Sequence, residues 1–204
     1  MRILPSGEHA VLVELDDLSQ ARSLVDSLRR DPIEGVRELV PAARTVLVIA
    51  EAGARLADIA TRVGTRKLNT RAQDGQAEQI EIPVCYDGPD LAEVAELTRL
   101  DEGGVVAAHT GQVWTVAFCG FLPGFGYLVG ESDALRVPRR PSPRTAVPRG
   151  AVGLADEYTG AYPRRSPGGW QLIGTTDAVL WDADREPAAL LRPGVKVRFV
   201  ETNT

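Results

Sequence analysis

Hydrophobic positions in the first 63 residues repeat with the periods of strands and helices. Alternating or β-branched runs predict strands within residues 3–15, at 36–40 and at 45–49. Apolar residues spaced by three and four predict a helix that Ser19 caps and that runs to Arg30, and a second helix at about 55–63. This order is typical of a split βαβ, ferredoxin-like α/β sandwich. Nothing in it suggests chemistry.

The second half of the chain follows a different pattern. Residues 64–79 are polar with a single large aliphatic residue, which is typical of a linker. The sequence then predicts a strand at 80–85, a helix that starts in a capping-box-like pattern at Asp90, and a helix at about 101–109. From residue 120 onward, short strand-like segments alternate with glycine and proline turns, which predicts a β-barrel or sandwich with long loops.

Composition separates the same two parts. All eleven aromatic residues lie at or beyond Tyr86, and residues 1–85 hold only 5 of the 20 glycines and 4 of the 14 prolines. We therefore expect an α+β protein with an N-terminal domain over 1–70, a linker over 71–79 and a second domain over 80–204.

Charge and cysteine content exclude several function classes. A net charge of −5 disfavours a nucleic-acid-binding protein, because such proteins neutralise phosphates with a basic surface. No apolar run approaches the ~20 residues that cross a bilayer, and the first residues do not resemble a signal peptide. Cys85 and Cys119 lie in apolar runs that favour buried, reduced thiols, and two cysteines with two histidines leave little material for a metal site. We expect a cytoplasmic protein with no nucleic-acid, membrane or metal partner.

One segment is basic within this acidic protein. Between Arg136 and Arg165 there are seven arginines against Asp156 and Glu157, a local charge of +5. Prolines stiffen part of the segment, so its planar guanidinium groups are held where they suit a carboxylate or a phosphate. The alternative for any single arginine is that it lies in a solvated edge loop and contacts no anion.

Three further features carry candidate chemistry, each with a structural alternative. Residues 120–127 combine glycines with aromatic residues after a predicted strand, which indicates either a ligand loop or a barrel corner. Residues 162–174 contain a Pro-Gly-Gly-Trp turn that could expose backbone amides to an anion or form an ordinary hairpin. His109 ends a predicted helix and is either a general acid or base or a partner of the helix dipole.

In order and over nearly the whole chain, the sequence carries the motifs of one protein family. They are Ile82-Pro83-Val84 with Tyr86, Gly88-Pro89-Asp90-Leu91, His109, Gly120-Phe121, Pro123-Gly124-Phe125, Tyr127-Leu128, Pro138-Arg139-Arg140, Pro143-Arg144, Val147-Pro148, Thr159-Gly160, Tyr162-Pro163, Ser166 to Gly174, Leu191 to Gly194 and Val197-Arg198-Phe199. The chain thus resembles the KipI family, whose members are also called 5-oxoprolinase B subunits or allophanate hydrolase subunit 1.

The resemblance implies a ferredoxin-like sandwich followed by a cyclophilin-like β-barrel of the carboxyltransferase type. It implies ATP-dependent opening of 5-oxo-L-proline to L-glutamate, with ATP and Mg²⁺ as co-substrate and no tightly bound cofactor. It also implies a homologous barrel subunit as partner, which we call the partner barrel subunit and which is also known as allophanate hydrolase subunit 2. A third 5-oxoprolinase chain and little activity of this chain alone are implied as well.

Carried over residue by residue, the resemblance implies two catalytic side chains, His109 for proton transfer and Arg144 for an anionic group. It implies substrate or nucleotide contacts from Pro123, Gly124, Phe125, Arg139, Tyr162, Pro167, Gly168, Gly169 and Trp170. Tyr158 is a further candidate contact, because it lies within the same proposed site. The chain departs from the family pattern at Asp156 and Tyr158, where a glycine and a glutamine are usual, at Trp114, where a tyrosine is usual, and at Thr175, where an arginine or histidine is common. Because Asp156 and Tyr158 lie in the proposed site, these two departures leave the identity of the substrate open.

Two other functions stay open at this level. One is an amidohydrolase subunit that acts on allophanate or another urea-derived amide without ATP. The other is a non-enzymatic, KipI-like inhibitor that binds a sensor histidine kinase through apolar and proline-containing surface.

Overall fold

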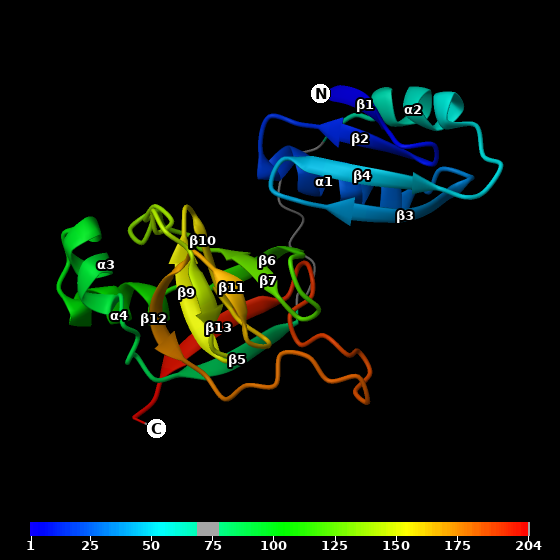
Figure 1. Ribbon diagram of the computed structural model, residues 1–204. Helices are drawn as coiled ribbons and strands as arrows, with labels where there is room; N and C mark the ends of the chain where they lie inside the picture. The colour runs from blue at the N-terminus through cyan, green and yellow to red at the C-terminus, as the bar shows by residue number, and fades with distance from the viewer. Residues whose placement is uncertain (69–77, 204) are drawn as a thin grey trace. The chain divides into compact units, whose positions relative to one another are not determined.

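The computed structural model describes residues 1–68 and 78–203, which fall into two compact units, Met1–Gly75 and Gln76–Thr204 (Figure 1). Of the predicted linker at 71–79, residues 71–77 lie outside the described residues. Among the described helices, none is both long and apolar enough to cross a membrane.

The N-terminal unit is a four-stranded antiparallel sheet with two helices. Its elements are β1 (Arg2–Ser6), β2 (Ala10–Glu14), α1 (Leu18–Arg30), β3 (Val36–Pro41), β4 (Thr45–Ala50) and α2 (Leu56–Gly64). The strand order β1-β2-β4-β3 places β4 between β2 and β3, which α1 connects. This is the split βαβ arrangement of the predicted ferredoxin-like sandwich, with β1 at one edge.

The prediction that Ser19 caps the first helix is wrong. The helix begins at Leu18, and the Asp17 side chain accepts a hydrogen bond from the Gln20 backbone N–H at 2.8 Å. Asp17 therefore satisfies one of the unpaired donors of the first turn, and Ser19 lies inside the helix.

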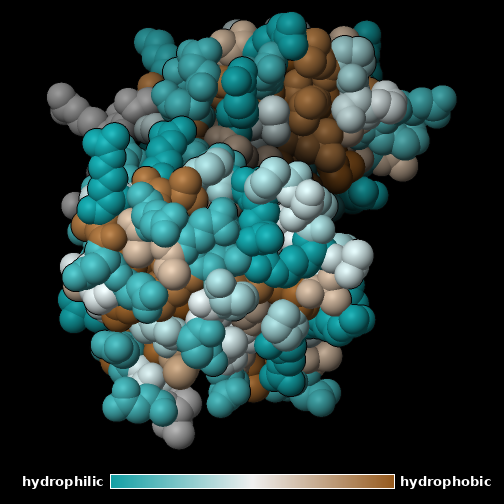
Figure 2. Space-filling model, turned by 60° about the vertical axis from the view of Figure 1, so that its left-hand side comes forward, coloured by the Kyte–Doolittle hydropathy of each residue, from teal (hydrophilic) through white to brown (hydrophobic). Residues whose placement is uncertain are grey.

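Alternation along the strands gives the N-terminal sheet one buried face. Val13 and Val48 point from that face into a core that also contains Leu24 of α1 and Val63 of α2. On the other face, paired strands place apolar side chains in one row across the sheet, Leu4, Leu12, Leu47 and Val40. Hydrophobic side chains gather on one side of this unit in Figure 2.

The C-terminal unit is a β-barrel with helices. Its elements are β5 (Gln79–Val84), α3 (Leu91–Thr98), α4 (Glu102–Thr110), β6 (Trp114–Cys119), β7 (Gly126–Val129), β8 (Arg144–Val147), β9 (Ala151–Ala155), β10 (Tyr158–Ala161), β11 (Ser166–Gly168), β12 (Gln171–Thr175) and β13 (Lys196–Glu201). Seven strands form one sheet in the order β12-β9-β10-β7-β6-β13-β5, while β8 and β11 form a separate ribbon. This architecture confirms the predicted barrel.

A short seam joins the two ends of the barrel sheet. Cys85, next to β5, and Thr175 in β12 exchange two backbone hydrogen bonds of 2.9 and 2.8 Å. Two glycines allow this approach: a Cβ at Gly174 would lie 2.4 Å from the Cys85 carbonyl oxygen, and a Cβ at Gly88 would lie 2.3 Å from the Leu172 carbonyl oxygen. Side chains larger than hydrogen at these positions would force the seam apart.

Candidate functional site

Seven aromatic side chains of the C-terminal unit form one group, the aromatic cluster. Its members are Phe118, Phe121, Phe125, Tyr127, Tyr158, Tyr162 and Trp170. The ring centroid of buried Phe125 lies 5.1 Å from those of Tyr127 and Tyr162 and 5.3 Å from that of Trp170, all edge to face. The structure thus brings together four predicted site residues, Phe125, Tyr158, Tyr162 and Trp170.

Glycines in the predicted motifs let these rings approach the backbone. A Cβ at Gly160 in β10 would lie 3.3 Å from Phe125 and 3.2 Å from Trp170. A Cβ at Gly168 in β11 would lie 2.4 Å from the Tyr162 hydroxyl oxygen. Gly168 therefore has a packing role against Tyr162, which sequence reasoning did not anticipate.

The tyrosines of the cluster carry neutral hydroxyls. Burial raises the pKa of Tyr162 to about 12 and raises the pKa of Tyr127, while the positive charge of Arg139 opposes the rise at both. Burial and the Glu157 carboxylate raise the pKa of Tyr158. The Tyr158 hydroxyl oxygen is buried and has no hydrogen-bond partner among the described residues.

A buried carboxylate, Asp90, holds two of the predicted basic residues. Its side chain is 4% exposed and accepts hydrogen bonds from Arg140 Nη1 at 2.7 Å and from Arg144 Nη2 at 2.6 and 2.8 Å. It also accepts the Leu172 backbone N–H of β12 at 2.7 Å. We call this arrangement the Asp90 clamp.

The clamp neutralises Arg144 while fixing where it lies. The second arm of the Arg144 guanidinium, Nη1, donates to the Trp170 carbonyl oxygen at 3.3 Å, so the side chain borders the aromatic cluster. Arg140 also lies 3.5 Å from the Glu93 carboxylate, which balances two arginines against two carboxylates. Because Nη2 donates to both oxygens of a buried carboxylate and Nη1 donates to a backbone carbonyl, little of the charge of Arg144 is left for a ligand.

Arg139 is in the opposite situation. Its side chain is 58% exposed and its Nε lies 3.7 Å from the Asp156 carboxylate, which is itself exposed. Such a contact is weak in water. The positive charge of Arg139 acts on the pKa of Tyr127 and Tyr162, so Arg139 combines a largely unpaired guanidinium with a place near the cluster.

His109 lies in the barrel core, at the end of α4. Its ring stacks on Phe199 with centroids 4.3 Å apart, and its contacts with other rings are to Tyr86 and Trp114. Nδ1 lies 2.7 Å from the Tyr86 hydroxyl, and Nε2 lies 2.9 Å from the Thr159 hydroxyl. Both ring nitrogens are therefore occupied.

The partners of His109 assign its protonation. The Thr159 hydroxyl donates to the Gly153 carbonyl oxygen at 3.2 Å, so it accepts from His109 Nε2–H, and Nδ1 in turn accepts from Tyr86. Burial lowers the pKa of His109 to about 3, which keeps the ring neutral. This geometry favours a positioning role, through Thr159 and the neighbouring Tyr158, over direct proton transfer; the predicted catalytic role stays a prediction.

Sequence reasoning missed Asp90, Phe118 and Thr159. Asp90 belongs to a family motif, and its place before α3 predicts a capping role, yet its side chain makes no capping hydrogen bond. Five arginines lie between residues 136 and 149 and need carboxylate partners. A motif aspartate such as Asp90 was therefore a candidate partner for them. Phe118 lies in β6, and Thr159 lies in β10 within a family motif, but neither pattern by itself indicates a contact with another site residue.

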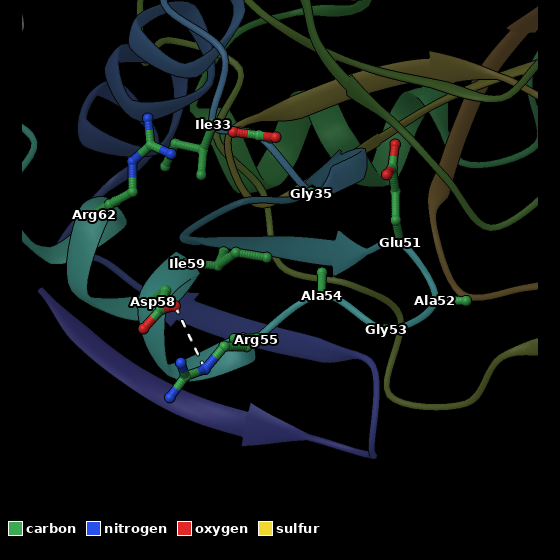
Figure 3. Close-up of a pocket in the computed structure, with 11 residues that line it drawn as sticks. Ile33, Gly35, Glu51, Ala52, Gly53, Ala54, Arg55, Asp58, Ile59 and Arg62 are labelled. Carbon is green, nitrogen blue, oxygen red and sulfur yellow. Dashed lines mark ion pairs between the residues drawn. The ribbon is translucent and has the colours of Figure 1, made fainter.

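A separate hollow lies in the N-terminal unit (Figure 3). It has a volume of about 430 Å³ and is lined by residues 33–35 before β3, by the turn 51–55 between β4 and α2, and by residues of α2. Its charged side chains have both signs, and Arg55 and Asp58 pair with each other at 3.6 Å. This lining favours no single ligand charge. Among the described residues, no group of three or more potential metal ligands occurs.

The neutral, buried His109 predicts a particular pH dependence of stability. Because its pKa is about 3 in the folded chain and about 6.5 when unfolded, the unfolded state gains a proton first as pH falls below 6.5. The free energy of unfolding should therefore decrease below pH 6.5, by at most about 1.4 kcal/mol per pH unit from this group. In His109→Gln this component should vanish.

Tryptophan fluorescence in urea measures this unfolding, because all three tryptophans lie in the C-terminal unit. His9→Gln is the matched control, since His9 is exposed, and it should keep the wild-type slope. Equal pH slopes for wild type and His109→Gln would contradict the assigned neutral histidine.

The chain is similar to known proteins in its sequence and in its fold. Residues 1–191 match the model of the family described as "Carboxyltransferase domain, subdomain C and D". The chain is 41% identical to the B subunit of 5-oxoprolinase from Escherichia coli O157:H7 over 202 residues, which cover 95% of this chain and 93% of that protein.

Solved structures share the fold. The crystal structure of TTHA0988 is 36% identical with a TM-score of 0.77; the match covers 96% of this chain but spans only 40% of that longer chain. The urea amidolyase of K. lactis, 18% identical with a TM-score of 0.78 over 98% of this chain and 15% of its own, shows likeness of fold alone. A family match over nearly the whole length and a full-length relative at this identity identify the chain as a member of the carboxyltransferase-domain family to which the 5-oxoprolinase B subunits belong.

Proposed function

We propose that this chain is the B subunit of an ATP-dependent 5-oxoprolinase that opens 5-oxo-L-proline to L-glutamate. The observation that carries the proposal is the identity of 41% over 95% of the chain with a protein named as that subunit of 5-oxoprolinase. The complex would include the homologous partner barrel subunit and a third chain. The N-terminal unit, which carries no candidate chemistry, would serve as a docking or scaffold unit.

The chemistry of the candidate site fits this substrate. 5-Oxoproline is a small flat ring with one carboxylate and one lactam group. Aromatic walls suit such a ring, and a guanidinium suits the carboxylate. An unactivated lactam resists water, so phosphorylation of its oxygen by ATP with Mg²⁺ would create a leaving group, and preorganised donors stabilise such a transfer.

Within this proposal the predicted site residues take different roles. Arg139 would hold the substrate carboxylate, with the Tyr158 and Tyr162 hydroxyls as neutral donors. Arg144 would border the site through Trp170, and His109 would position β10 from behind. The loop residues Pro123, Gly124, Pro167, Gly168 and Gly169 would shape the pocket edges.

The proposed activity predicts that the assembled complex releases glutamate from 5-oxoproline only when ATP is present. We would co-express this chain with the partner barrel subunit and the third chain, then compare glutamate release with and without ATP and ammonia release from allophanate. Omitting this chain is the control and should abolish turnover. Ammonia release from allophanate without ATP would favour the amidohydrolase instead, and absence of any turnover together with tight binding to a sensor histidine kinase would favour the inhibitor.

The role given to Arg139 predicts a selective effect on substrate affinity. Arg139→Gln removes a charged hydrogen bond to the substrate carboxylate, which is worth about 1.5 to 3 kcal/mol. The KM for 5-oxoproline should therefore rise roughly 10-fold to 100-fold, while the KM for ATP changes little. Arg136→Gln is the matched control, because Arg136 is exposed and has only a loose ion pair with Glu157 at 3.8 Å. An unchanged KM for 5-oxoproline in Arg139→Gln would remove Arg139 from the site.

A further inference from the structure

Two loops of the C-terminal unit present large apolar side chains to solvent. Among the described residues, eight large hydrophobic side chains are exposed, and three of them are Phe121 at 55%, Val179 at 44% and Trp181 at 45%. Together with exposed Pro123, we call them the Phe121–Trp181 patch. Exposed aromatic residues that gather in one place mark interaction sites more often than exposed residues scattered singly.

The two loops pack closely against each other at Gly124, which has no side chain. Its φ is +83°, and a Cβ there would lie 2.8 Å from the Trp181 Cβ and 3.1 Å from the Leu180 carbonyl oxygen. Leu180 is buried while Val179 and Trp181 on either side are exposed, as in an extended segment whose alternate side chains face opposite ways. The patch is therefore a fixed feature of the surface.

Both loops have a defined backbone conformation. The Arg185 guanidinium donates to the carbonyl oxygens of Val179 at 3.1 Å and Ala188 at 3.0 Å, which ties the second loop together. In the first loop, Phe121 has a φ of +67°, a conformation that bulky residues rarely adopt. Such a backbone conformation has an energetic cost, and residues that adopt it occur often at functional surfaces.

The patch borders the aromatic cluster. The Phe121 ring centroid lies 5.5 Å from that of Phe125 and 6.4 Å from that of Tyr162. The chain continues from Tyr162 to Arg164 and Arg165, which are exposed and make no ion pair within the described parts of the chain. The apolar surface is thus continuous with the candidate site and lies near unpaired positive charge.

We propose that the Phe121–Trp181 patch docks the partner barrel subunit at the edge of the substrate site. This inference rests on the proposed function. The length of the TTHA0988 chain is consistent with a large neighbouring module, because this chain spans only 40% of it. The complementary face of the partner barrel subunit would be apolar at its centre, with carboxylates opposite Arg164 and Arg165.

The test measures the affinity of the full chain for the purified, fluorescently labelled partner barrel subunit. The double variant Phe121→Asn, Trp181→Gln should weaken binding roughly 100-fold, because truncated aromatic anchors at an interface centre lose most of its affinity. Asn tolerates positive φ, so the unfolding midpoint of Phe121→Asn should not fall. Leu97→Gln, at a position 46% exposed on α3, is the matched control and should bind within about twofold of wild type.

Three results would overturn the patch as the docking surface for the partner barrel subunit. These are wild-type affinity in the double variant, no binding of that subunit by the wild-type chain, and a concentration-dependent dimer of this chain that the double variant alone abolishes. The two proposals fail separately: a patch-dependent complex that releases no glutamate from 5-oxoproline contradicts the function and supports the surface.

Discussion

The buried carboxylate of Asp90 is the contact on which the geometry of the candidate site depends. It lies five residues beyond Cys85 of the barrel seam, and it accepts hydrogen bonds from β12 and from two arginines of the proline-rich segment. One charge thus ties the barrel seam, the β8–β11 ribbon and the Trp170 turn together. A buried carboxylate needs such partners, because desolvation without them would be far too costly.

The clamp divides the arginines into two kinds. Arg140 and Arg144 are fixed and largely neutralised, so they give the site its shape. Arg139, next in sequence to Arg140, is exposed and affects the tyrosine hydroxyls of the aromatic cluster. Under the proposed function, this division leaves Arg139 beside the aromatic cluster with a guanidinium that can pair with a small anionic substrate. It also explains why arginine content alone overstates the number of ligand contacts.

The fold followed from the sequence because its signals are local. Alternation in the first strands and the change to glycine and proline turns after residue 120 correctly predicted a sandwich followed by a barrel. The first helix start was misplaced by two residues because Asp17 and Ser19 are both good capping residues, and the choice depends on backbone geometry. The grouping of Phe125, Tyr162 and Trp170 followed from motifs, but the place of Tyr158 among them and their mutual contacts required the strand order.

The contacts that the sequence did not predict join residues far apart in the chain. Asp90 and Arg144 are 54 residues apart, and His109 and Thr159 are 50 apart, so neither pair has a local pattern. A histidine at a helix end has the same sequence context whether it faces solvent or a barrel core. Only the packing of Phe199 and Trp114 around His109 makes its neutral state evident.

The central claim is that the charge of Arg144 is committed to Asp90. A double-mutant cycle with Asp90→Asn and Arg144→Gln, followed by tryptophan fluorescence in urea, measures that commitment directly. We predict that Asp90→Asn loses about 3 kcal/mol of unfolding free energy, because it leaves two arginines without their carboxylate. Arg144→Gln should lose about 2 kcal/mol, because Asp90 then keeps only Arg140 and the Leu172 backbone N–H. The double variant should lose clearly less than the sum, with a coupling energy of about 2 kcal/mol. If the losses of unfolding free energy in the two single variants add up to that of the double variant within about 0.5 kcal/mol, the clamp is contradicted. Arg144 would then be free to bind a ligand.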